Sequence, residues 1–330
     1  MRPFRYERAA DEAEAVQLCA EGGSGATYLG GGTNLVDLMK LGVARPETVI
    51  DVSHLPSGGV RETSDGALLV GAGVSNSELA ADTRVRRSYP VLSQALLSGA
   101  SGQLRNVATV GGNLLQRTRC PYFMDPTKPC NKRSPGTGCP ARDGEHHNLA
   151  VLGASEACIA THPSDMAVAM VALDSRVHVR SRETERSVPV EELYRLPGEE
   201  PDRDFTLAPG ELVTAVEVPS LPWATRSAYR KARERTSYAF ANGSVAAALD
   251  IEDGTVRDVR LAFGAVAARP WRARAAEEVL RGGQASRARF AAAAEAELEA
   301  CEPLRDNAYK LPLIRNLVTS VLNGLVGGAS

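Results

Sequence analysis

The stretch Leu29-Gly30-Gly31-Gly32-Thr33-Asn34-Leu35-Val36 decides the fold, because it joins a strand pattern to a helix pattern through consecutive glycines. Residues 27–29 predict a short strand, and residues 35–41 predict a helix. Glycine lets the backbone turn sharply, and the start of the following helix presents N–H groups and partial positive charge to an anion. Thr33 and Asn34 can add side-chain hydrogen bonds to phosphate oxygens. The stretch therefore predicts an anion-binding turn.

A second glycine turn has the same chemistry. It is Ala108-Thr109-Val110-Gly111-Gly112-Asn113-Leu114, and together the two turns could hold the two ends of one pyrophosphate. The alternative is that these glycines only make turns. Neither stretch is a P-loop, because no Gly-Lys-Ser/Thr follows, and Gly71-x-Gly73 has Asn76 where a dinucleotide fingerprint needs a third glycine.

Composition places the chain among ordinary globular proteins. It has 330 residues, of which 43% are hydrophobic and 24% charged, so we expect two domains. The net charge of −2 gives no reason to expect nucleic acid or an anionic membrane surface as partner. We find neither a signal-peptide pattern nor an apolar stretch long enough to span a bilayer. We therefore expect a cytoplasmic protein, or a periplasmic one that is exported folded together with a signal-bearing partner.

The order of predicted elements indicates an α+β fold. Short strands and amphipathic helices alternate up to residue 114, and strands followed by alanine-rich helices fill the end of the chain. The Pro219-Ser220-Leu221-Pro222 stretch predicts a boundary between residues 1–222 and 223–330. Between residues 117 and 147 no periodicity is sustained. An irregular segment of this length inside a compact chain is usually functional or disordered.

Four of the six cysteines crowd into and just after this segment: Cys120, Cys130, Cys139 and Cys158. A cytoplasmic setting disfavours disulfides, and zinc usually shows tight Cys-x2–4-Cys pairs, which are absent. A [4Fe–4S] cluster needs four thiolates and tolerates irregular spacing, and the many Lys and Arg residues of the loop would offset its charge. The residues alone favour an iron–sulfur cluster and leave zinc and no metal as alternatives. Cys19 and Cys301 are expected to be inert thiols.

The joint set of motifs resembles the FAD-binding subunit of the xanthine dehydrogenase family. The two glycine turns, Pro163-Ser164-Asp165 before a helix, and the run 229–235, Tyr-Arg-Lys-Ala-Arg-Glu-Arg, carry the resemblance over nearly the whole chain. It implies a two-lobed FAD-binding domain of the vanillyl-alcohol-oxidase (PCMH) type, followed by a small C-terminal α+β domain like that of CO dehydrogenase flavoproteins.

The cysteine loop, an insertion at about 115–160, narrows the resemblance to two subgroups that carry an extra [4Fe–4S] cluster. They are the FAD subunit of bacterial periplasmic aldehyde oxidoreductase and the β subunit of 4-hydroxybenzoyl-CoA reductase. The sequence of residues 116–123, Gln-Arg-Thr-Arg-Cys-Pro-Tyr-Phe, resembles the aldehyde oxidoreductase subunit more than the reductase subunit. The resemblance thus implies that Cys120, Cys130, Cys139 and Cys158 ligate the cluster.

The resemblance also implies a set of FAD contacts. Residues of both turns would hold the pyrophosphate: Leu29, Gly30, Gly31, Gly32, Thr33, Asn34, Leu35, Val36, Thr109, Val110, Gly111, Gly112 and Asn113. Asp165 would bond the ribose or phosphate side, although it could instead cap its helix. Gly99 and Leu212 match backbone or apolar contacts near the flavin. Lys231 matches a lysine whose charge would stabilise reduced, anionic flavin, although it could be an exposed strand residue.

The function implied is electron transfer within a three-subunit enzyme. A large subunit with a molybdenum cofactor would oxidise an aldehyde, and a small subunit with two [2Fe–2S] clusters would pass electrons to this chain. Its FAD would deliver them to an external acceptor, so no catalytic acid or base is expected here. The alternatives are a reductase that runs the same chain of carriers in reverse, and a non-enzymatic, zinc-stapled scaffold that binds a partner. Neither the aldehyde nor the acceptor is predicted.

Overall fold

The N-terminal lobe is a small parallel sheet with two helices. In the computed structural model, which describes residues 1–327, its strands lie in the order β1-β3-β2. Its elements are β1 (Arg5–Arg8), α1 (Glu12–Gly22), β2 (Ala26–Leu29), α2 (Leu35–Leu41) and β3 (Thr48–Asp51). Asp11 accepts a hydrogen bond from the Glu14 N–H at 2.8 Å and caps α1. The first glycine turn connects β2 to α2, as the sequence predicts.

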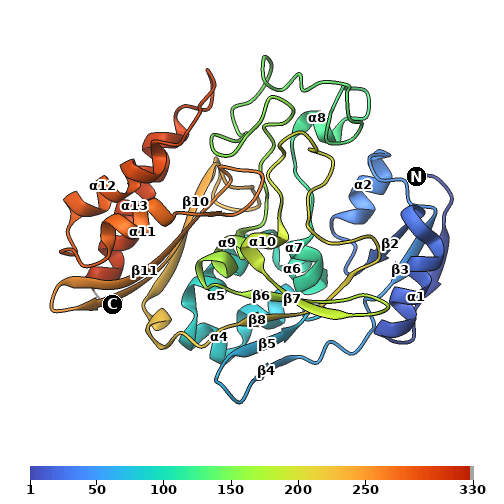
Figure 1. Ribbon diagram of the computed structural model, residues 1–330, viewed down its shortest axis with the longest axis horizontal. Helices are drawn as coiled ribbons and strands as arrows, with labels where there is room; N and C mark the ends of the chain where they lie inside the picture. Colours follow the sequence, from blue (N-terminus) through green and yellow to red (C-terminus); the bar gives the residue numbers. More distant parts are fainter. Residues whose placement is uncertain (328–330) are drawn as a thin grey trace.

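The second lobe is an antiparallel sheet of strand order β4-β5-β8-β6-β7, covered by helices on one face (Figure 1). Its strands are β4 (Val60–Glu62), β5 (Leu68–Gly71), β6 (Arg176–Arg180), β7 (Glu185–Pro189) and β8 (Leu212–Val218). Its helices are α3 (Asn76–Ala81), α4 (Thr83–Ser88), α5 (Pro90–Ser98), α6 (Gly102–Val107), α7 (Val110–Leu114), α9 (Asp165–Ala172) and α10 (Val190–Leu193). Helix α9 is buried at every position and fills the centre of this core.

The C-terminal unit is an antiparallel sheet of order β12-β11-β10-β9 between two helical layers. Alternate residues of β10 belong to different cores: Ala246 and Ala248 pack with α5 and α9, while Val245 and Leu249 pack with the C-terminal helices. Its elements are β9 (Ser227–Ala232), β10 (Gly243–Glu252), β11 (Thr255–Gly264), β12 (Trp271–Arg272), α11 (Arg274–Leu280), α12 (Arg287–Leu298) and α13 (Lys310–Val326). A short 3-10 helix, Pro222–Thr225, precedes β9.

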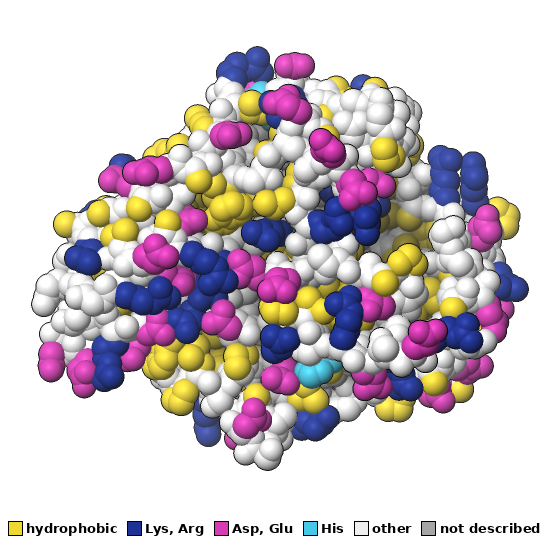
Figure 2. All heavy atoms as spheres, viewed as in Figure 1, with side chains coloured by type: hydrophobic (Ala, Val, Ile, Leu, Met, Phe, Trp, Pro, Cys, Tyr) yellow, Lys and Arg dark blue, Asp and Glu magenta, His cyan; other side chains and the backbone are white. Residues whose placement is uncertain are grey.

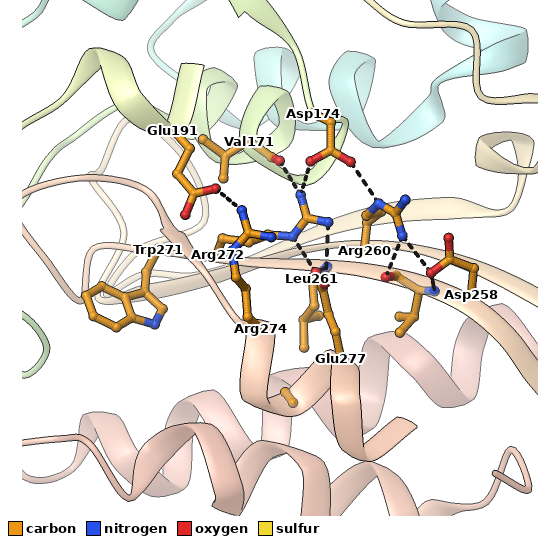
Figure 3. A network of polar contacts seen from close by, with 12 residues as sticks. Val171, Asp174, Glu191, Asp258, Arg260, Leu261, Trp271, Arg272, Arg274 and Glu277 are labelled. Carbon is orange, nitrogen blue, oxygen red and sulfur yellow. Dashed lines mark hydrogen bonds and ion pairs between the residues drawn. The ribbon is translucent and has the colours of Figure 1, made fainter. Parts of the chain in front are cut away.

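A buried charge network ties this unit to α9 (Figure 3). Arg272 donates to the Val171 carbonyl at 2.8 Å and to Asp174 Oδ1 at 2.7 Å, both just at or beyond the end of α9. It also pairs with Glu277, and both side chains are only 2% exposed. Glu277 in turn accepts from the Leu261 N–H of β11 at 2.8 Å. The network therefore links α9, β11, β12 and α11, and the Arg272–Glu277 pair at its centre is buried.

The predicted α+β architecture is confirmed, and several short elements were missed. Helices at 35–41 and 90–98 and the strand at 212–218 lie where the sequence predicts them. Strands β1, β4 and β7 were not predicted, because their alternation of apolar and polar residues is brief and they lie at sheet edges with exposed side chains.

Within residues 1–327, no helix is long and apolar enough to cross a bilayer. Charged side chains of both signs are interspersed over the face in Figure 2, in keeping with the small net charge.

The cysteine loop stands out from the lobes as irregular chain. Apart from α8 (Pro121–Met124) and an isolated β-bridge between Ser155 and Cys158, residues 117–160 contain no regular secondary structure. The loop has a small apolar cluster of its own, built around Phe123, Ala141 and Ile159 together with cysteines. It is held from outside by α13: Lys310 Nζ donates to the Asn148 carbonyl at 3.1 Å and to the Ala265 carbonyl at 2.6 Å.

Candidate cofactor site

One large cavity, of about 830 Å³, lies where the lobes and the C-terminal unit meet. Both glycine turns, α5, the start of α9 and the β9–β10 loop contribute to its wall. This volume is within the range of sites for large organic ligands. The cavity is thus built from segments far apart in the sequence, and it is the natural candidate for the functional site.

The two glycine turns pack directly against each other beside this cavity. A Cβ atom on Gly31 would lie 1.9 Å from the Val107 carbonyl oxygen, and one on Gly30 would lie 2.9 Å from Thr109 Oγ1. Thr109 caps α7 by accepting from the Gly112 N–H at 3.2 Å. The first two glycines therefore serve the contact between turns. They let the N-terminal lobe bring its turn within reach of the second one.

Several buried polar atoms on the cavity wall have no hydrogen-bond partner within the described chain. They are Asn34 Nδ2, Asn76 Oδ1, Arg119 Nε, His162 Nε2 and Ser244 Oγ. Burial lowers the pKa of His162 to about 4, so its imidazole is neutral near pH 7 and one ring nitrogen carries a hydrogen. Buried polar groups are nearly always hydrogen-bonded, so unmatched groups around one cavity indicate a polar ligand. The set offers both donors and acceptors, which suits a molecule with phosphates and hydroxyls.

A buried ion pair forms another part of the wall. Ser164 caps α9 by accepting from the Ala167 N–H at 3.0 Å, so Asp165 is not needed as the cap. Asp165 Oδ2 lies 2.8 Å from Lys231 Nζ, and their side chains are 8% and 4% exposed. The other oxygen, Oδ1, accepts from Tyr229 at 2.5 Å. Lys231 is therefore a buried residue that joins β9 to the start of α9, and it is not an exposed strand lysine.

The structure brings most of the predicted site residues together. Seven lie on the cavity wall: Thr33, Asn34, Gly99, Gly112, Asn113, Asp165 and Lys231. The other predicted residues of the two turns are next to these in the chain but do not line the cavity: Leu29, Gly30, Gly31, Gly32, Leu35, Val36, Thr109, Val110 and Gly111. Asn113 Oδ1 accepts from Ser164 Oγ at 2.5 Å, which joins the second turn to α9.

Leu212 is the exception among the predicted contacts. It begins β8 and is buried with Ala15, Val16 and Ile50 under the N-terminal lobe, away from the residues that line the cavity. Conversely, no sequence pattern selects Asn76, Arg119, His162, Phe240 or Ser244 as site residues, although all five line the cavity. Their position on the cavity wall depends on contacts between segments that are distant in the sequence, so no pattern of neighbouring residues predicts it.

The four clustered cysteines also come together. Cys120, Cys130, Cys139 and Cys158 line one small, separate cavity, and all four are free thiols. Burial raises the pKa of Cys120 to about 11 and also raises the pKa of Cys139 and Cys158. The Ala160 N–H donates to Cys158 Sγ at 3.4 Å. Cys120 lies on the walls of both cavities, so the two sites are neighbours.

The arrangement of these sulfurs does not by itself define a metal ion site. Among residues 1–327, no group of three or more His, Cys, Asp or Glu side chains is placed so that it could hold a metal ion. A single zinc ion, with Zn–S bonds of about 2.3 Å, would require sulfurs about 3.8 Å apart. Four cysteine sulfurs on one cavity wall are a donor set that both zinc and iron–sulfur sites use.

Comparison with known proteins identifies the class. The model for the FAD binding domain in molybdopterin dehydrogenase matches residues 2–221, and the model for the CO dehydrogenase flavoprotein C-terminal domain matches residues 227–325. The chain belongs to this family of FAD-binding subunits and is an oxidoreductase component of the molybdenum hydroxylase type. The cavity with its two glycine turns and unmatched polar atoms fits such a dinucleotide.

Individual relatives agree with this assignment. The aldehyde oxidoreductase FAD-binding subunit PaoB of Escherichia coli K12 is 49% identical over 324 residues, which cover 98% of each chain. The carbon monoxide dehydrogenase medium chain of Hydrogenophaga pseudoflava is 26% identical over 325 residues, 97% of this chain and 96% of that one. A solved carbon monoxide dehydrogenase from the same organism superposes with a TM-score of 0.77 and covers 99% of both chains.

Proposed function

We propose that this chain is the electron-transfer FAD subunit of a three-subunit molybdenum-dependent aldehyde oxidoreductase. The observation that carries the proposal is the cavity beside the two packed glycine turns, in a chain 49% identical to an aldehyde oxidoreductase FAD-binding subunit. In this proposal a large subunit with the molybdenum cofactor oxidises the aldehyde, and a small subunit with two [2Fe–2S] clusters delivers the electrons. An external acceptor takes them from this chain, either in the cytoplasm or after export to the periplasm with the partners.

The residues on the cavity wall would share the work of holding FAD. Backbone N–H groups of the first turn, residues 29–36, would face the pyrophosphate where α2 begins. The N–H groups of residues 110–113 donate within the chain, so the second turn, residues 109–113, would contact FAD through Gly112 and Asn113, which line the cavity. Asn34 Nδ2 and His162 Nε2 can donate hydrogen bonds, whereas Asn76 Oδ1 can only accept one from a hydroxyl or amine. When bound, FAD supplies the exchange between one-electron and two-electron carriers.

The Asp165–Lys231 pair would contact FAD in this site, Asp165 on the ribose or phosphate side and Lys231 near the isoalloxazine ring. It is buried, it lies on the cavity wall, and Gly99 approaches it closely: a Cβ at that position would be 3.3 Å from Asp165 Oδ2. A larger residue at 99 would push against this carboxylate. The pair therefore supplies a fixed positive and negative charge at the wall, with Asp165 held in place by Tyr229.

The four clustered cysteines are proposed as ligands of a [4Fe–4S] cluster. Two considerations support this: four free cysteines line one cavity, and the side chain of Lys132, which can offset the charge of thiolates, lies on the same wall. The proposed division is an FAD-binding domain at 1–222, with the cluster loop at about 115–160, and a C-terminal domain at 223–330. The cluster would lie next to the flavin cavity through Cys120.

The proposal is tested by co-expressing the chain with its two partner subunits and adding aldehydes to the purified complex without oxygen. We expect aldehydes to bleach the flavin absorbance of the complex, because electrons reach FAD from the molybdenum site. The isolated chain should not respond to aldehydes, although dithionite should reduce it. A complex that contains molybdenum and FAD, but whose flavin no aldehyde in a broad panel reduces, would contradict the aldehyde assignment.

A further inference from the structure

Lys132 is a buried charge beside the cysteine cavity. Its side chain is 4% exposed, and within the described part of the chain it is the one charged residue on the wall of that cavity. Its place is fixed by its neighbour, since Asn131 Nδ2 donates to the Ala157 carbonyl at 3.0 Å, next to Cys158. An ammonium group is costly to bury, so its presence here needs a reason.

Lys132 pairs with Asp204, but this single carboxylate does not neutralise both of the cations that contact it. Its Nζ lies 2.5 Å from Asp204 Oδ1 and donates to the Pro201 carbonyl at 2.7 Å. The same carboxylate also receives Arg117, whose Nε lies 2.6 Å from Asp204 Oδ2. The two cations lower the pKa of Asp204, so it is ionised near pH 7. Two positive charges thus share one negative charge, and a net charge of +1 remains.

Both cations of this group lie close to the cysteine cavity, and the side chain of Lys132 is on its wall. Arg117 stacks over Phe123, whose ring belongs to the same apolar cluster as the cysteines, at 4.7 Å from its centroid. Four thiolates on an iron–sulfur core carry net negative charge, which increases on reduction. A fixed positive charge at short range in a place of low dielectric favours the more negative state.

Resting on the proposed [4Fe–4S] site, we propose that the Lys132–Asp204–Arg117 triad is the counter-charge of that cluster and raises its reduction potential. Lys132 acts as a positioning residue and is not a ligand. The ion pairs with Asp204 also connect the cysteine loop to the segment that follows α10. The position of Asp204 in that segment therefore fixes where the two positive charges lie. The triad would thereby set how readily the cluster accepts an electron from its neighbour, the flavin.

The test is a redox titration of the cluster by electron paramagnetic resonance in the complete complex. Lys132→Met keeps the shape and removes the charge, and we expect its midpoint potential to fall, with the ratio of reduced to oxidised cluster at a given potential at least tenfold lower, about 59 mV for a one-electron couple. Arg117→Gln should shift the potential in the same direction, and Asp204→Asn in the opposite one. Lys128→Met, an exposed lysine of the same loop, should leave it unchanged.

The outcomes separate this inference from the proposed function. Unmodified protein without iron would refute the cluster itself. Full iron content with an unchanged potential in Lys132→Met would refute the counter-charge. If Lys132→Met fails to retain iron, the other two variants decide: opposite shifts for Arg117→Gln and Asp204→Asn support the inference, and shifts of the same sign, or none, overturn it.

Discussion

Replacing Gly31 by valine is expected to abolish FAD binding. Any Cβ at this position would lie 1.9 Å from the Val107 carbonyl oxygen and 2.7 Å from its carbon, distances that no side chain can occupy. Because the obstacle is backbone, rotation of a side chain cannot relieve it. The two turns must separate, and the amide groups of the first turn would then no longer be held in place beside the pyrophosphate.

The measurement is the amount of flavin per chain after purification of the complex. A matched control is Gly102→Ala in α6, because a Cβ there meets nothing closer than 4.0 Å. We expect this control to retain full flavin, and Gly31→Val to retain less than about a tenth of it, which corresponds to more than 1.4 kcal/mol of lost binding free energy. Normal flavin content in Gly31→Val would show that the contact between the turns does not organise the site.

The second large effect is expected for Arg272→Ala. This change leaves the Glu277 carboxylate buried with Arg281 as its remaining cationic partner, at 2.9 Å, and removes the donor to the Val171 carbonyl. Removing one partner of a buried ion pair typically costs about 3–5 kcal/mol. We expect a loss of this size in the free energy of unfolding, measured by chemical denaturation of the isolated chain.

The exposed Arg274–Glu191 pair is the matched control, since Arg274 is 62% exposed and lies two residues further along the chain (Figure 3). Arg274→Ala should cost less than about 1 kcal/mol. Replacing Arg272 and Glu277 together by methionine should recover much of the loss, because no unpaired charge then remains buried. Equal effects for Arg272→Ala and Arg274→Ala would contradict the role of burial.

The local chemistry of the sequence predicts a large part of the fold. The glycine turn fixes where α2 begins, and the Ser75–Glu78 capping box is present at the start of α3. Helix α9 starts at the residue after Ser164, which caps it as the sequence allows. These elements depend on signals within a few residues. Edge strands such as β7, which pair with distant segments and expose their side chains, give no such signal.

The candidate site is predicted less completely than the fold. The glycine turns and the Ser-Asp motif identify one side of the cavity, because their residues must turn sharply or begin a helix. Asn76, His162 and Ser244 come from three separate segments, and only the packing of those segments makes them neighbours. Leu212 was assigned to the flavin site on resemblance, yet the register of β8 turns it toward the core under the N-terminal lobe.

The direct test of the whole account is the quantity of FAD and iron per chain in protein purified without oxygen. We predict one FAD and about four iron atoms per chain, with the absorption of both a flavin and an iron–sulfur cluster. Cys139→Ser should lose iron and keep FAD, because the two cavities are separate. A native preparation that contains neither FAD nor iron would contradict the account.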